Sequence, residues 1–297
     1  MAAIPETTIA EPSGQEQLKS FQRDSFIELN GRERAFALID GGTGREILGP
    51  FDRLESPWLV QQNITPQFDD GCIIVRGKIG GADAVVIAME PAFQGGSLGE
   101  VSGAKICAAL ELACRDSKNG KPTSAVFLLE TGGVRLPEAN LGLAAVAEIC
   151  SAVLELRHHA PIVCISAGSV GSFGGMSLIA GLASYVIMTP EGRLGLNGPE
   201  VIEQEHGIEE FDSRDRALIW AIDGGEQRFA TGLADVLVRD DISQLCNAVR
   251  AVLKSGLPTI HRSQQIQLFK ERVAKLNTEK QIEPCELRNA WKREEGK

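Results

Sequence analysis

Short apolar runs separated by glycines fill the central part of the chain. The runs Cys72–Lys78 and Ala84–Met89 flank Gly80-Gly81, which predicts a β-hairpin. A glycine-rich segment, residues 95–99, comes next, and the apolar positions that follow it fall at helical spacing. This part of the chain is therefore expected to form a hairpin, a glycine turn and a helix, in that order.

A unit of buried strand, glycine turn and helix then repeats. Three short apolar runs are expected to be strands, at residues 125–129, 162–165 and 185–188. The first leads through the turn 131–135 into a helix that reaches about Arg157, and the second leads through the turn 166–172 into a helix that reaches about Leu182. A further helix is expected to begin at Pro199. Strands that alternate with glycine turns and helices favour an α/β fold with a parallel or mixed sheet.

The two ends of the chain differ from this centre. Residues 1–25 are polar and are expected to form a flexible leader, without the basic and then apolar order of a signal peptide. Residues 26–255 hold the α/β domain, and residues 256–297, rich in Lys, Arg and Glu, are expected to form a charged helical tail. Residues 160–190 contain no charge, but their glycines and Pro161 predict a buried strand, turn, helix and strand rather than a membrane span.

Composition narrows the possible classes of function. Of the 297 residues, 43% are hydrophobic and 24% are charged, which provides enough apolar surface for a folded core and excludes intrinsic disorder. The net charge of −10 disfavours a nucleic-acid partner, because phosphates would be repelled. Seven unclustered cysteines indicate free thiols in a reducing compartment, so a cytoplasmic protein without a membrane partner is expected.

The glycine turns are the strongest candidates for chemistry. Where a strand ends in glycines and a helix begins, unpaired main-chain N–H groups point into one small volume at the positive end of the helix dipole. Such donors bind an anion or stabilise a developing oxyanion. Gly132-Gly133 and Gly171-Ser172 both occupy this place. The alternative, that these glycines only allow close packing of strand against helix, stays open at this point.

Several other site motifs are absent from the sequence. Gly44 is followed by Gly49-Pro50 rather than Gly-Lys, so there is no P-loop, and the glycines of residues 168–174 do not have the spacing of a dinucleotide-binding turn. No two cysteines have C-x-x-C spacing, and the adjacent His158-His159 point to different faces, so no metal site is expected.

A serine hydrolase is one alternative. Residues 167–171 lie between a predicted strand and a predicted helix and approximate the G-x-S-x-G turn, with Ser169 as the nucleophile. The candidate bases and orienting acids are His206 or His261 and Asp212, Asp223 or Asp235. An alanine stands in place of the first glycine of the motif, which disfavours this alternative.

Four motifs occur in one order along the chain: residues 95–99, residues 131–138, the glycine turn at Gly171, and residues 195–204. In this order they resemble the carboxyltransferase branch of the crotonase superfamily, and most of all the β-subunit family of biotin-independent malonate decarboxylases. The resemblance runs from about Gly71 to Asp240. It implies that residues 26–255 form a crotonase-like (ClpP/crotonase) carboxyltransferase domain built from repeated strand, glycine turn and helix units.

Two departures from bacterial acetyl-CoA carboxylase subunits favour the decarboxylase family. Those subunits typically carry a four-cysteine zinc ribbon at the N-terminal side, whereas Cys72 is the first cysteine here. Their second turn also has a Gly-Gly pair, which we align with Gly171-Ser172. A serine supplies a main-chain N–H as glycine does, and its side chain could add a contact.

The resemblance implies decarboxylation of a malonyl thioester to an acetyl thioester and CO2. It also implies that the acyl group is carried on the dephospho-CoA-like prosthetic group of an acyl carrier protein, with no other cofactor tightly bound. Loss of CO2 leaves an enolate on the thioester oxygen, and one backbone donor aimed at this oxygen lowers the barrier by about 3 kcal/mol.

The resemblance also assigns residues to this chemistry. The catalytic set is Gly171, Ser172, Gly132 and Gly133, and the substrate-binding set is Gly95, Gly96, Val134 and Arg135. Gly171 and Ser172 are expected to be the main donor pair at the thioester. Arg135 could attract the substrate carboxylate or form a salt bridge with Glu138 or another acid, and both roles remain open.

The family further implies a hetero-oligomer. A homologous γ subunit is expected to share the site, and an acyl carrier protein is expected to visit it, received by a local basic patch or by the partner subunit. Two other functions stay open: the β subunit of a biotin-dependent acyl-CoA carboxyltransferase, which forms the same enolate, and a non-catalytic scaffold that only docks the carrier.

Overall fold

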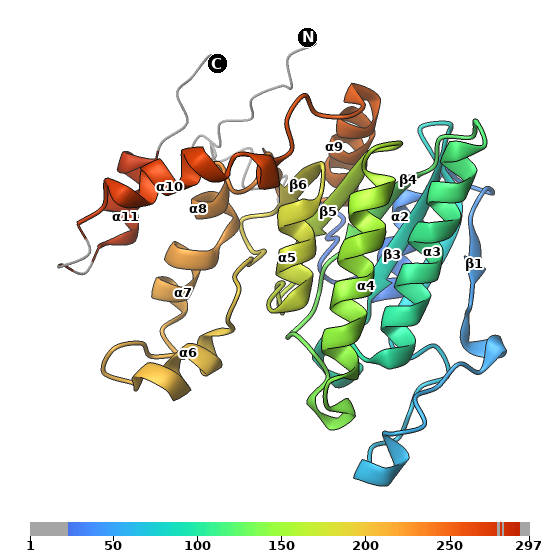
Figure 1. Cartoon of the computed structure of the whole chain (residues 1–297), viewed down its shortest axis with the longest axis horizontal. Helices are drawn as coiled ribbons and strands as arrows, with labels where there is room; N and C mark the ends of the chain where they lie inside the picture. The colour runs from blue at the N-terminus through green and yellow to red at the C-terminus, as the bar shows by residue number, and fades with distance from the viewer. Residues whose placement is uncertain (1–22, 278–279, 281, 292–297) are drawn as a thin grey trace.

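The computed structural model describes residues 23–277, 280 and 282–291, and in this part of the chain seven strands form one sheet (Figure 1). In spatial order they are β1 (Arg45–Ile47), β2 (Cys72–Ile79), β3 (Ala82–Met89), β4 (Ser124–Leu128), β5 (Ile162–Ser166), β6 (Tyr185–Met188) and β7 (Val236–Leu237). The pairs β1–β2 and β2–β3 are antiparallel, and every later pair is parallel. The mixed sheet expected from the sequence is therefore confirmed.

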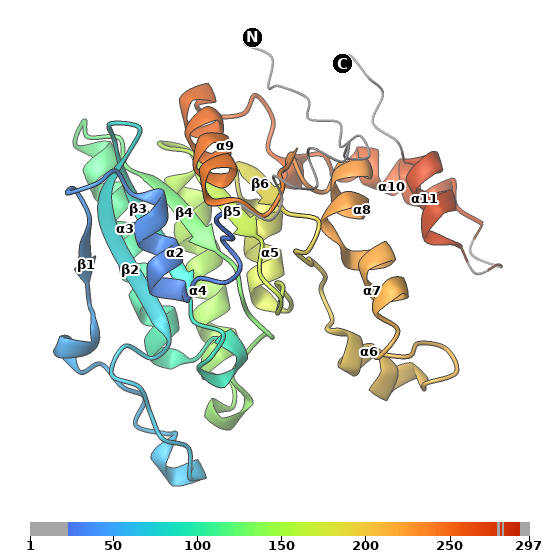
Figure 2. The ribbon, with the colours of Figure 1, turned by 180° about the vertical axis from the view of Figure 1, so that it is seen from behind.

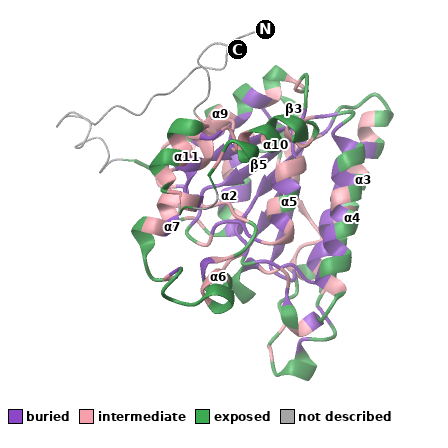
Figure 3. Cartoon of the chain, turned by 60° about the vertical axis from the view of Figure 1, so that its left-hand side comes forward, coloured by how far each residue is buried: buried purple, intermediate pink, exposed green. Residues whose placement is uncertain are grey.

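Helices cover both faces of this sheet, so the domain has three layers (Figures 1 and 2). One face carries α3 (Glu100–Lys118), α4 (Leu141–Leu156) and α5 (Gly175–Leu182), and the other carries α2 (Gly31–Leu38) and α9 (Ile242–Ser255). Successive side chains of a strand point to opposite faces, so Ile74 joins the core under α3 whereas Val75 joins the core under α2. Figure 3 shows the buried strands between the partly exposed helices.

The central strands were the most predictable elements. The hairpin is confirmed: Ile79 pairs with Ala82, and Gly80 and Gly81 form the two-residue turn with φ of 59° and 82°. The uncharged stretch 160–190 forms β5, α5 and β6 in the core, as expected. None of the described helices combines the length and the apolar character that crossing a membrane requires.

Two helices begin later than expected. The segment at Pro137 forms only a 3-10 turn, Leu136–Glu138, and the chain then passes through Ala139 at φ of 52° before α4 begins at Leu141. After the second glycine turn, Ser172 first pairs with Thr131, and α5 begins at Gly175. In both places the turn occupies residues that the sequence pattern assigned to the helix.

The remaining elements pack beyond β6 and around the rim. They are α6 (Pro199–His206), α7 (Arg216–Asp223), α8 (Gly225–Ala230), α10 (Ile266–Ala274) and α11 (Pro284–Ala290), with 3-10 turns at Pro50–Asp52, Val60–Gln62, Gln94–Gly96 and Arg262–Gln264. The tail contains two helices, and Arg288 of α11 donates to Gln227 of α8 at 2.9 Å. Of the predicted leader, residues 1–22 lie outside the described residues, and Ser25 donates to Asp240 at 2.5 Å. All seven cysteines are free thiols, as expected.

Candidate active site at the glycine turns

The glycine turns follow the carboxyl ends of adjacent strands, β3 to β6, and meet at one edge of the sheet (Figure 1). Isolated bridges join Leu98 to Val134 and Thr131 to Ser172. The N–H of Gly195 donates to the carbonyl of Ser172 at 3.1 Å. The structure therefore brings together segments of all four motifs that the sequence analysis singled out.

The second turn does not offer the two N–H groups that were expected of it. The N–H of Gly171 donates to Oε1 of Glu130 at 3.1 Å, and the N–H of Ser172 donates to the carbonyl of Arg193 at 2.9 Å. The Ser172 side chain is fully buried, so it cannot contact a substrate either. An N–H that already donates inside the chain is not available to an enolate oxygen, so these two residues shape the turn instead of supplying its donors.

The expected N–H donors of the first turn also have acceptors within the chain. The N–H of Gly132 donates to the carbonyl of Gly95 at 3.0 Å, and the N–H of Gly133 donates to Oγ1 of Thr131 at 3.1 Å. At Gly96, with φ of 66°, an added Cβ would lie 1.8 Å from a main-chain oxygen. Gly95 and Gly96, which were expected to bind substrate, therefore pack one turn against the next.

Unpaired N–H groups lie immediately beside these turns. Within the described part of the chain, the N–H of Val134 has no hydrogen-bond acceptor, and neither do those of Gly175 and Met176, the first two residues of α5. Gly174, which directly precedes α5, lies close to the Val134 N–H. A Cβ added at Gly174 would lie 3.1 Å from Cα of Gly133 and 3.9 Å from the nitrogen of Val134. Gly174 and Gly175 are half-buried. The start of α5 and the Val134 N–H thus form a candidate oxyanion site.

The candidate oxyanion site lies three residues further along the chain than the donor pair expected from the sequence. A Gly-Gly pair, Gly174-Gly175, lies three residues after Gly171-Ser172. Gly174 has φ of 61°, and a Cβ on Gly175 would lie 2.2 Å from Val146 of α4, so both positions require glycine. The pair itself was visible in the sequence, but its place at the first turn of α5 was not.

Arg135 is not available to a substrate carboxylate. Its guanidinium is 1% exposed, and Nη1 donates to Asp70 at 2.6 Å and to Glu138 at 2.9 Å. Nη2 donates to the carbonyl of Ser97 at 3.1 Å. Burial raises the pKa of Asp70, although the charge of Arg135 opposes this shift. The salt bridge expected as one alternative is therefore present, and in this chain it occupies the guanidinium that the other alternative would direct at a substrate carboxylate.

Glu130 is a structural residue of the site that the sequence analysis missed. It lies under the second turn and is 2% exposed. A Cβ on Gly168 would lie 1.9 Å from the Glu130 carboxyl carbon, so the turn has no room for a side chain at this position. The signal in the sequence was an acidic residue placed directly after an apolar strand, but nothing in the pattern indicated its partners.

The geometry does not support the serine hydrolase. Ser169 makes no hydrogen bond to a histidine within the described part of the chain, and His206 lies exposed at the end of α6. The candidate acids pair with arginines rather than with either histidine: Asp212 with Arg214, Asp223 with Arg228 and Asp235 with Arg262. The three-part arrangement that activates a serine is therefore not assembled.

One group of possible metal ligands occurs among the described residues. Side-chain atoms of Cys114, Glu155 and His159 lie within 4.8 Å of one another on α3, on α4 and just after α4. Lys118 already provides a cation there, with Nζ 2.5 Å from Glu155. The group is separate from the glycine turns and contributes nothing to the candidate site.

Comparison with known families decides the assignment. The model of the carboxyl transferase domain matches residues 47–292, which is most of the chain. The chain belongs to the carboxyl transferase domain family. This membership and the structural matches below confirm the crotonase-like fold and the resemblance to malonate decarboxylase subunits.

The named relatives of this chain are a malonyl carboxyltransferase and chains of malonate decarboxylase. Malonyl-S-ACP:biotin-protein carboxyltransferase MADC from Malonomonas rubra is 38% identical over 283 residues, which cover 91% of this chain and 89% of the relative. A chain in the crystal structure of a Pseudomonas malonate decarboxylase hetero-tetramer in complex with malonate is 53% identical, with a TM-score of 0.90 over 93% of this chain and 100% of that chain. A chain of the Pseudomonas MdcD-MdcE hetero-dimer is 50% identical, with a TM-score of 0.73 over 86% and 98%.

Proposed function

We propose that this chain is the subunit of a malonate decarboxylase that converts a malonyl thioester on an acyl carrier protein into the acetyl thioester. The observation that carries the proposal is the group of unpaired N–H donors at Val134, Gly175 and Met176. It occurs in a chain that is 53% identical to a malonate decarboxylase subunit crystallised with malonate.

These donors fit the charge that the reaction creates. The bond between the carboxylate carbon and Cα of the malonyl group breaks, its electron pair forms an enolate on the thioester, and CO2 leaves. Cα then takes up a proton. Negative charge therefore develops on the thioester oxygen, next to the first turn of α5, where the helix dipole adds to the N–H donors. Each well-aimed donor lowers this barrier by about 3 kcal/mol.

The same reaction explains why the site needs a partner. Gly95 and Gly132 are exposed, and Leu136 and Leu196 beside them expose 81% and 59% of their surface. An enolate needs protection from water, and large exposed apolar side chains mark interaction surfaces. We infer that a second, homologous subunit covers this edge and that the malonyl group arrives on the dephospho-CoA-like arm of the carrier. The similar Pseudomonas chains occur in a hetero-tetramer and a hetero-dimer, which supports a hetero-oligomer.

A biotin-dependent carboxyltransferase is the second candidate. It is favoured by the name of the Malonomonas rubra relative, a malonyl-S-ACP:biotin-protein carboxyltransferase. Both reactions pass through the same enolate and use the same donors. They differ only in the fate of CO2, which is released by a decarboxylase and transferred to a biotin nitrogen by a carboxyltransferase.

One experiment separates these functions. The complex assembled from purified subunits is incubated with malonyl-loaded carrier protein, and CO2 and acetyl carrier are measured with and without avidin, which sequesters biotin. Equal amounts of CO2 and acetyl carrier that do not respond to avidin support the decarboxylase. Acetyl carrier that forms only with an accessible biotinylated protein supports the carboxyltransferase. If neither product forms in a complex that binds the carrier, the chain is a docking scaffold.

A further inference from the structure

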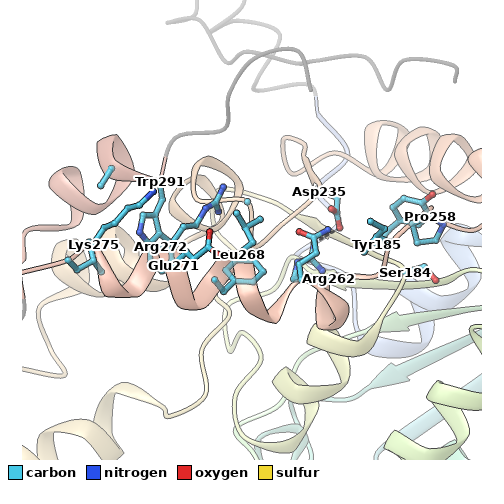
Figure 4. A pocket seen from close by; sticks show the side chains of 16 residues that line it. Ser184, Tyr185, Asp235, Pro258, Arg262, Leu268, Glu271, Arg272, Lys275 and Trp291 are labelled. Atoms are coloured by element: carbon cyan, nitrogen blue, oxygen red, sulfur yellow. Dashed lines mark hydrogen bonds and ion pairs between the residues drawn. The ribbon is translucent and has the colours of Figure 1, made fainter.

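A cavity lies away from the glycine turns, at the amino end of β6. It is a groove of about 600 Å³ between this edge of the sheet and the helices α10 and α11, which we call the tail groove (Figure 4). Tyr185 and Arg262 line it near the sheet, and Phe269, Arg272, Lys275 and Trp291 line it along the two helices. Its volume is in the range of sites that bind small organic molecules. The glycine turns follow the carboxyl end of β6, so the tail groove is separate from the candidate active site.

The tail groove has one more cationic than acidic side chain in its lining, although the whole chain carries a net charge of −10. Three cations line it, Arg262, Arg272 and Lys275, together with two acids, Asp235 and Glu271. Lys275 forms no ion pair in the described part of the chain, and Arg272 donates to the carbonyl of Thr231 rather than to an acid. Such a local excess of positive charge attracts an anion.

Two buried donors in the lining also have no acceptor. Nη2 of Arg262 donates to Asp235 at 2.6 Å, but its Nη1 has no hydrogen-bond partner among the described residues. The indole Nε1 of Trp291 likewise has none. Buried donors in folded proteins normally have an acceptor. Both residues line the groove, so an anionic oxygen bound there is a possible acceptor for these donors.

The groove also has flat walls. The guanidinium of Arg272 lies 5.7 Å from the ring centre of Phe269 and 6.0 Å from that of Trp291. Figure 4 shows Arg272, Trp291 and Lys275 together toward one end, and Arg262 with Tyr185 toward the other. Stacked guanidinium and aromatic planes provide a surface on which a planar ring packs. We propose that the tail groove binds an organic anion in which a phosphate or carboxylate group is joined to a flat ring.

The proposal is tested with defined probes on the full-length protein. AMP supplies a ring and a phosphate, and 2-naphthoate supplies a ring and a carboxylate, so the two probes distinguish the two possible anions. Adenosine and inorganic phosphate each supply only one half of the ligand. Dissociation constants are measured by isothermal titration calorimetry. We expect AMP or 2-naphthoate to bind at least about tenfold more tightly than adenosine or phosphate, because a charge-assisted hydrogen bond contributes roughly this factor.

Variants connect the binding to the groove. Lys275→Ala removes an unpaired cation and Trp291→Phe keeps a ring while removing the unpaired N–H, and each is expected to weaken binding by about fivefold or more. Lys270→Ala is the matched control, because Lys270 lies on the same helix but does not line the tail groove, and it is expected to leave binding unchanged. The proposal is overturned if neither probe binds at millimolar concentration, if adenosine binds as tightly as AMP and naphthoate, or if both Lys275→Ala and Trp291→Phe bind as the wild type does.

Discussion

The carboxylate of Glu130 accepts the main-chain N–H of Gly171 at 3.1 Å. The same oxygen accepts the N–H of Val170 at 3.2 Å, and the other oxygen pairs with Nη1 of Arg34 at 3.0 Å. Arg34, on α2, also donates to the carbonyl of Phe26 at 3.1 Å. A buried ion pair therefore ties the N-terminal part of the domain to the turn that leads into α5.

Replacing Glu130 tests whether this pair holds the turn. Glu130→Ala leaves the Arg34 charge buried without its partner, which typically costs about 3–5 kcal/mol of unfolding free energy. We expect a loss of this size in urea denaturation and, because the turn is released, a loss of decarboxylation in the assembled complex. Glu155→Ala is the control, since Glu155 pairs with Lys118 at the surface, and it should leave both measurements nearly unchanged. Equal stability of the two variants would contradict the assigned role.

The candidate oxyanion site is tested at Gly174. Gly174→Ala adds a Cβ about 3.1 Å from Cα of Gly133 at a residue with φ of 61°, so the backbone carrying the Val134 N–H must shift away from α5. Misplacing one donor costs about a hundredfold in turnover. Gly181→Ala, on the same helix, adds a Cβ to open space and is expected to keep full activity. The turnover number and the assembly of the complex are measured for both variants. If the assembled complex with Gly174→Ala keeps full activity, these donors do not stabilise the enolate.

The sequence was informative where local pattern determines structure. The apolar runs located β2 to β6, and the glycines located the turns that follow them, because strand burial and positive φ leave strong local signals. The start of α5 was misplaced because Ser172 pairs with Thr131, a contact across 41 positions that no local pattern encodes. The pair of Arg34 and Glu130, 96 positions apart, was invisible for the same reason. The position of the glycine turns was therefore predictable, whereas the N–H groups left unpaired were not.

Arg135 provides a test of structural against substrate-binding roles. Arg135→Met leaves the carboxylates of Asp70 and Glu138 buried without a cation, so we expect a loss of about 3–5 kcal/mol in unfolding free energy. Arg135→Lys keeps the charge but not the forked geometry, and it should be intermediate in stability. Because the guanidinium does not reach a substrate, KM for the malonyl carrier should stay within about twofold in the Lys variant. A large rise in KM with unchanged stability would instead indicate that Arg135 binds the substrate.

Thiol reactivity should follow burial. Burial raises the pKa of Cys72 to about 12, and burial with nearby Glu111 raises that of Cys107 to about 11, whereas Cys285 is exposed. The thiolate is the reacting form, so iodoacetamide at neutral pH should modify Cys285 first and Cys72 only after unfolding. Mass spectrometry of the alkylated protein gives the order, and Cys285→Ser should remove the fast phase. Rapid modification of Cys72 in the folded protein would show that β2 opens readily.

His261 makes the stability sensitive to acid. Burial lowers the pKa of His261 below its usual value of 6.5, and the nearby charges of Arg157 and His158 lower it further. The unfolded chain therefore takes up a proton at this residue more readily than the folded protein does. It follows that the unfolding free energy is fully retained above about pH 6.5 and falls as the pH drops below this value.

Substitution of His261 isolates this contribution. In His261→Gln the side chain no longer titrates, so the difference in urea midpoint between about pH 7.5 and about pH 5.5 should be smaller than in the wild type. His206→Gln, at an exposed position of α6, should keep the wild-type difference. If His261→Gln loses as much stability on acidification as the wild type, the sensitivity arises from other groups.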